Sequence, residues 1–209
     1  MKKIIDINSW PRKEYFEFFN QFDEPFFGIT SQVDCTQLYR KVKEQKESFF
    51  IHYLYLCTKA LNLVDELHYR YVDDKVVRFD NIHVSSTIGR KDGSFAFTFV
   101  NYNEDFEIFK QETLREIEKV NNSDGLLLTE VAIRIDTIHF SPIPWVNFSS
   151  IQHARNFKIK DSVPKICVGK FQNIKNKKLM PVSLHAHHGL ADGYHAGLFF
   201  DHLQKLMNS

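Results

Sequence analysis

The sequence contains few of the residues that mark secreted, fibrous or multi-domain proteins. Its 209 residues include only 3 cysteines, 8 glycines and 6 prolines. Because the cysteines are odd in number and far apart, we expect reduced thiols and no disulfide framework. The sequence has no linker rich in Gly, Ser or Pro, no internal repeat and no low-complexity segment. These absences predict a single domain over residues 1–209.

Charge and hydropathy argue against two further classes of partner. Lys and Arg total 27 and Asp and Glu total 26, which leaves a net charge of +1. So small an imbalance creates no field that would attract nucleic acid or an anionic membrane. The most apolar stretch, 49–64, contains His52 and Lys59 and is too short to cross a bilayer. The first residues lack the apolar region of a signal peptide, so we expect a cytoplasmic protein with no nucleic-acid or membrane partner.

Apolar residues are plentiful, and their spacing changes between helical and strand-like along the chain. Aromatic residues make up 14% of the sequence, which is enough for a sizeable core without metals or disulfides. Spacing of three and four residues predicts helices over 11–24, 34–42, 48–64, 105–121 and 194–207. Alternation predicts strands over 27–33, 69–72, 76–79, 82–88, 95–102, 131–140, 165–171 and 179–188. Strands and helices without strict alternation favour an α/β two-layer sandwich, in which helices cover a mixed β-sheet.

The segment with most chemical information is 184–195, LHAHHGLADGYH. Three histidines lie at the end of a predicted strand, and Asp192 and Gly193 come just before a predicted helix. Side chains alternate between the two faces of a strand, so His185 and His187 share one face and His188 takes the other.

Three interpretations of these histidines compete. In the first, they are ordinary core or surface residues of a chain that holds ten histidines. In the second, His185 and His187 bind a metal with Asp192 or His195, although no other Cys or His cluster supports such a site. In the third, one histidine at the mouth of a cleft is a general base, because imidazole titrates near neutral pH.

A resemblance to a known family favours the third interpretation. Residues 187–193, HHGLADG, match the H-H-x-x-x-D-G signature of the chloramphenicol acetyltransferase superfamily. Dihydrolipoyl acyltransferases and peptide-synthetase condensation domains share this signature, but the former also carry a lipoyl domain and the latter are about twice as long. Residues 10–19, WPRKEYFEFF, and 141–148, SPIPWVNF, also resemble segments of the small type A chloramphenicol acetyltransferases. The three motifs lie in the family's order, so the resemblance extends over the whole chain.

The resemblance implies a reaction and the residues that perform it. An acetyl group would pass directly from acetyl-CoA to a hydroxyl of chloramphenicol, without an acyl-enzyme or a metal, and so give antibiotic resistance. His188 matches the family's general base, whose ring is held by its own backbone carbonyl. Ser141 matches the serine that donates a hydrogen bond to the oxyanion. His139 lies where family members often have Asn.

The resemblance also implies supporting and binding residues. Arg12 would pair with Asp192 through a bidentate contact that braces the catalytic loop, and Gly193 would let the chain turn into the last helix. Lys170 and Phe171 match residues that bind CoA. An apolar acceptor pocket would include Phe18, Phe19, Phe27, Ile151 and Cys167.

Family members are trimers in which the base and much of the acceptor pocket come from neighbouring subunits. The resemblance therefore implies a homotrimer with sites at its subunit interfaces. Phe19 replaces a Tyr found in many members, and Cys167 replaces a Thr. These departures keep two alternatives open: an O-acyltransferase for another hydroxylated acceptor, and a non-catalytic protein that binds an apolar ligand.

Overall fold

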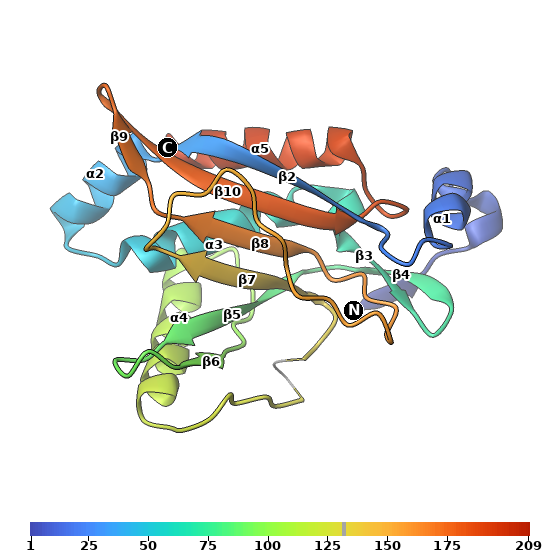
Figure 1. The fold of residues 1–209 in the computed structure, drawn as a ribbon, viewed down its shortest axis with the longest axis horizontal. Coiled ribbons are helices and arrows are strands. Elements are labelled where there is room, and N and C mark those ends of the chain that lie inside the picture. The colour runs from blue at the N-terminus through green and yellow to red at the C-terminus, as the bar shows by residue number, and fades with distance from the viewer. Residues whose placement is uncertain (131–132) are drawn as a thin grey trace.

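Two β-sheets organise residues 1–130 and 133–209, which the computed structural model describes (Figure 1). The smaller sheet is antiparallel, with its strands in the spatial order β1 (Lys2–Ile4), β4 (Lys75–Phe79) and β3 (Tyr69–Val72). Asp73 and Asp74 both have positive φ in the turn between β3 and β4, as a two-residue hairpin requires. The strands predicted over 69–72 and 76–79 are therefore present, and they form a hairpin.

The larger sheet is mixed. Its spatial order is β2 (Phe26–Asp34), β10 (Lys177–His187), β8 (Lys165–Gly169), β7 (Thr137–Ile143), β5 (His83–Gly89) and β6 (Phe95–Phe97), with β9 (Gln172–Ile174) paired to β10. Strands β5, β7 and β8 run parallel to one another, whereas β10 is antiparallel to both β8 and β2. This arrangement confirms the predicted α/β fold with a mixed sheet.

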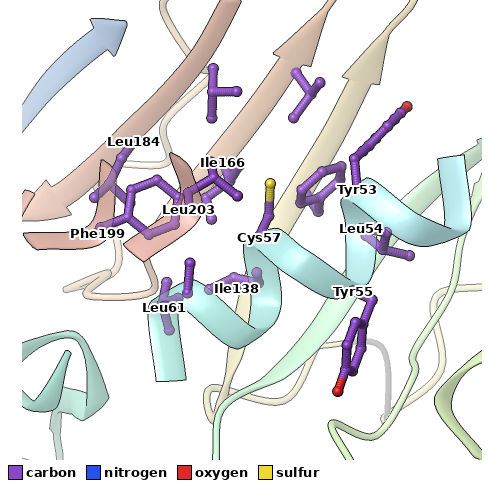
Figure 2. Close-up of a cluster of buried hydrophobic side chains, with 14 of the residues drawn as sticks. Tyr53, Leu54, Tyr55, Cys57, Leu61, Ile138, Ile166, Leu184, Phe199 and Leu203 are labelled. Carbon is purple, nitrogen blue, oxygen red and sulfur yellow. The ribbon is translucent and has the colours of Figure 1, made fainter. Parts of the chain in front are cut away.

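Helices cover one face of the larger sheet (Figure 1). The helices are α1 (Lys13–Phe19), α2 (Thr36–Gln45), α3 (Phe49–Asn62), α4 (Phe106–Asn121) and α5 (Gly193–Met207), with short 3-10 helices at Ile7–Ser9 and Asp65–His68. Helix α1 lies beyond the end of the larger sheet and packs near the smaller one (Figure 1). Figure 2 shows side chains of α3 and α5 meeting those of β7, β8 and β10 in the core. Full burial of one such aliphatic or aromatic side chain contributes about 1.5–3 kcal/mol.

Three predicted elements differ from the structure. Helix α1 ends at Phe19 and does not continue to residue 24, because the Phe19 ring stacks on His188 and so holds the end of the helix against the turn after β10. The strand predicted over 95–102 is a strand only over Phe95–Phe97, as β6. The predicted strand over 131–140 begins only at Thr137 as β7. Residues 131–132 of that prediction lie outside the described residues.

The face of the larger sheet opposite the helices carries polar side chains in rows. His139 lies in register with Ser85 on β5 and with Lys165 on β8, and Lys165 lies in register with His185 on β10. The next row holds Ser141, Cys167 and Ser183. Residues at the intervening positions point the other way, into the core, because strand side chains alternate. The segment 144–164 crosses in front of β8 and β10 on the polar face (Figure 1).

Candidate active site

The start of helix α5 is joined to the N-terminal part of the chain by one ion pair. Arg12 Nη1 donates to Asp192 Oδ2 at 2.9 Å, and Asp192 Oδ1 accepts from the Tyr194 N–H at 3.0 Å. Burial alone would raise the pKa of Asp192, but the hydrogen bond from Arg12, the charges of His195 and Arg12 and the Tyr194 N–H together outweigh it, and the pKa lies below its usual range. Nε and Nη2 of Arg12 are buried with no partner among the described residues, so the contact is a single hydrogen bond and not the expected bidentate pair.

The two adjacent histidines of the signature lie where strand β10 ends and a tight turn begins. Strand β10 ends at His187, whose carbonyl accepts from the N–H groups of Leu190 and Ala191. The His187 ring is buried, and its Nδ1 accepts from the Gly189 N–H at 3.2 Å. Burial lowers the pKa of His187 to about 4, so this imidazole is neutral at pH 7. His187 is therefore a buried residue at the end of β10, next to the turn.

His188 lies just past the end of β10, where it contacts two aromatic rings. Its ring stacks on Phe19 with centroids 3.9 Å apart and lies 4.8 Å from the Phe27 ring. Its backbone N–H donates to the Pro25 carbonyl at 2.8 Å, which fixes the residue to the start of β2. The Nδ1 atom is buried and has no hydrogen-bond partner in the part of the chain described. The bond to its own carbonyl that the resemblance implied is therefore not formed in the single chain.

Ser141 lies on a different part of the sheet and lines a cavity of about 580 Å³. The walls of this cavity are mostly aromatic and aliphatic, and they include Phe95 and Phe97. Cys167 is in register with Ser141 and is fully buried. Burial raises the pKa of Cys167 to about 12, so its thiol stays protonated and is a poor nucleophile.

The register shows that one chain does not bring His188 to Ser141. Ser141 is level with Cys167, which is level with Ser183 on β10. His188 lies five residues beyond Ser183, which is about 16 Å along an extended strand. Ser141 is also two strands away from β10 across the sheet. A reaction that needs both side chains therefore requires the Ser141 of another subunit.

The other predicted site residues divide between these two places. Phe18 is 57% exposed and packs edge-on against Phe19, on the His188 side. Ile151 lies half-buried in the segment 144–164 that covers the polar face. Lys170 is exposed directly after β8, and the Phe171 ring lies edge-on to Tyr39 with centroids 5.1 Å apart.

Gly193 does not have the conformational role that the sequence predicted. Its φ lies outside the left-handed region, and a Cβ added there would meet no atom within 4 Å. The chain turns into α5 through the Asp192 cap, in which the Asp192 N–H donates to His195 Nδ1 at 3.2 Å. The prediction that a glycine is needed for this turn is therefore wrong for the single chain.

Sequence reasoning did not identify the polar row beneath the large cavity as a group. His139, His153 and Lys165 all line this cavity. Lys165 is a buried charged residue at the first position of the otherwise apolar strand β8, which is unusual. The pattern that could have identified them is a polar side chain at every second position of an otherwise apolar strand, as at His139 and Ser141. Only the strand register showed that these residues meet.

Two structural findings concern metals and membranes. Within residues 1–130 and 133–209, no three His, Cys, Asp or Glu side chains are grouped so that they could hold a metal ion. Of the helices described, none combines the length and apolar character needed to cross a membrane.

Comparisons with known proteins agree over almost the whole chain. The family model named chloramphenicol acetyltransferase matches residues 2–204. The chain is 33% identical to a chloramphenicol acetyltransferase of Staphylococcus aureus, covering 97% of this chain and 94% of the relative. It is 30% identical to chloramphenicol acetyltransferase 3 of Escherichia coli, covering 98% and 96%. A solved chloramphenicol acetyltransferase superposes with a TM-score of 0.92 at 32% identity, covering 99% of this chain and all of that one.

Fold and comparisons together define the class of protein as an acyltransferase built on a two-layer α/β sandwich. Within that class, the chain belongs to the chloramphenicol acetyltransferase family.

Proposed function

We propose that this protein transfers the acetyl group of acetyl-CoA to a hydroxyl of chloramphenicol or a similar small molecule. The observation that carries the proposal is the environment of His188. Its ring stacks on Phe19 and contacts the Phe27 ring, and its Nδ1 is buried. No described residue bonds its Nε2, so this nitrogen is free to meet a substrate.

His188 acts as the general base. Its Nε2 takes the proton from the acceptor hydroxyl while that oxygen attacks the thioester carbonyl of acetyl-CoA. The stacked rings fix the imidazole plane, so the base keeps its direction during the attack. When the tetrahedral intermediate collapses, the proton passes to the departing CoA sulfur, which leaves as a free thiol.

Ser141 stabilises the oxyanion that the attack creates. Its hydroxyl lies at the polar edge of an otherwise apolar cavity, and a hydrogen bond to charge is strong in such surroundings. The cavity volume of about 580 Å³ suits an aromatic acceptor of the size of chloramphenicol. Lys170 and Phe171 supply a cation and an aromatic face for the phosphate and adenine of CoA, and Asp192 with Arg12 braces the turn after His188.

The complete site forms between subunits of a homotrimer. The register argument supports this arrangement, because Ser141 and His188 of one chain are too far apart to act on one substrate. Phe18, Phe22 and Trp145 support it too, since 47–75% of each is exposed in the single chain. The main core, whose members run from Val33 to Met207, supports one acetyltransferase domain over residues 1–209, and the composition supports a cytoplasmic location.

Release of free thiol from acetyl-CoA in the presence of chloramphenicol tests the proposal. The wild-type protein should release thiol only when the acceptor is present. The His188→Ala variant should lose about 10²–10⁴-fold in rate, the usual contribution of a general base. His202→Ala, at a half-buried position of α5, is the matched control and should keep the wild-type rate. An active His188→Ala protein would contradict the mechanism.

A further inference from the structure

A second, smaller cavity adjoins the large one. Its volume is about 170 Å³, and it shares His153 and Lys165 with the wall of the large cavity. Arg155, His185, Gln152 and the carboxylate of Glu24 also line it. Four basic side chains, one amide and one carboxylate therefore surround a space large enough for a compact polar group.

Two of these nitrogens have no hydrogen-bond partner. His153 Nε2 and Arg155 Nε are both buried and unpaired among the described residues. Asp161 Oδ2 lies 3.7 Å from Arg155 Nε, which is too long for a hydrogen bond. Buried polar nitrogens without partners are costly, so acceptor atoms of a ligand would be favourable for Arg155 Nε, and for His153 Nε2 in the tautomer that carries its proton there.

The charges around the small cavity are balanced. Lys165 Nζ donates to Asp161 at 2.6 Å, and Arg155 Nη1 donates to Glu24 at 2.8 Å. Burial, and then the charges nearby, lower the pKa of His153 to about 4, so this ring is neutral at pH 7. The cavity therefore offers hydrogen-bond donors without a large excess of positive charge.

Packing holds these donors in place. The Arg155 guanidinium lies 3.6 Å from the centre of the Phe26 ring, and the His153 ring meets the His185 ring edge-on at 4.8 Å. His185 in turn lies against Gly28, where a Cβ would come within 2.5 Å of its ring. Because donors fixed in advance lose little entropy on binding, this arrangement is typical of a recognition site.

We propose that the acceptor carries an oxygen-rich hydrogen-bond-accepting group, such as a nitro group or a carboxylate, which binds in the small cavity. This inference rests on the proposed function. The apolar body of the acceptor fills the large cavity, its reacting hydroxyl lies near Ser141, and its oxygen-rich group bonds His153 and Arg155. The spacing between strands and the rise per residue place Ser141 about 10 Å from the small cavity. A substituted aryl ring on a short chain therefore spans the distance between Ser141 and this cavity.

Three acceptors that differ in one substituent test the inference. They are chloramphenicol and two analogues in which hydrogen or carboxylate replaces the para-nitro group. The wild-type kcat/KM for the nitro and carboxylate compounds should exceed that for the hydrogen compound by at least about tenfold, since a site built to hydrogen-bond a group discriminates against its loss. His153→Leu and Arg155→Gln should each bring this ratio close to one.

Two further variants separate the cavity from general effects. Gly28→Ala should also lower the ratio, because the new methyl group displaces His185 into the cavity while leaving both donors present. Lys158→Gln removes a charge from the same segment outside both cavities, and it should leave the ratio and the rates unchanged. Thermal unfolding of each variant shows whether it is folded.

The outcomes distinguish the inference from the function on which it rests. A wild-type ratio near one, with active enzyme, overturns the inference and leaves the proposed function intact. Absence of thiol release from every acceptor overturns the proposed function. In that case, calorimetry with the carboxylate analogue tests the binding role of the small cavity separately. Tighter binding to the wild type than to Arg155→Gln supports the inference, and equal binding overturns it.

Discussion

At the scale of single residues, adjacent histidines of one motif lie in opposite environments. His187 closes the end of β10 and is 3% exposed, whereas His188 begins the turn and contacts Phe19 and Phe27. Burial removes water from the first imidazole, and its pKa falls to about 4. The proton transfer that we propose therefore falls to the second histidine, and the first contributes to stability.

The buried His187 makes stability depend on pH. Its folded pKa of about 4 lies below the ordinary 6.5, so between these values the unfolded chain binds the extra proton. Stability is therefore lost as the pH falls from 6.5 towards 4, by up to about 3 kcal/mol for this residue. Urea unfolding at several pH values measures it. His187→Gln should flatten the dependence and His202→Gln should not; an equal slope in all three proteins would refute this role.

At the scale of elements, α3 and α5 fix the position of β10, the strand that ends directly before His188. Phe199 and Leu203 of α5 pack on Leu184 of β10 with no exposed surface (Figure 2). The sequence predicted both helices from their apolar spacing. It also predicted a helix as far as residue 24, which is wrong because the Phe19 ring stacks on His188, a contact between distant segments that overrides the helical pattern after Phe19.

Truncation of α5 at its core contact tests this support. Phe199→Ala removes a fully buried ring and should lower the free energy of unfolding by about 3–5 kcal/mol. Phe200→Ala, at the neighbouring partly buried position, should cost clearly less. Urea unfolding of both variants gives the comparison, and similar losses would contradict the packing described for this helix.

At the scale of the whole molecule, the separation of Ser141 from His188 predicts complementation between inactive subunits. His188→Ala and Ser141→Ala proteins, unfolded together and refolded as a mixture, should form trimers in which some interfaces hold both native residues. For random mixing of a cyclic trimer, about a quarter of all sites regain the pair. Each variant refolded alone is the control. A mixture no more active than the controls would show that the two residues act within one chain.

The sequence by itself determined the helix and strand periodicities, the mixed α/β fold and the three motifs that carry the family resemblance. These depend on local spacing, which a chain displays without folding. Tertiary structure decided which residues share a site: strand register separated Ser141 from His188 and gathered His139, Lys165 and His185 in one row. It also showed that Arg155 and His153 border the same small cavity. Such proximity depends on strand pairing between distant segments, and hydrophobic spacing along one segment carries no information about its partner's register.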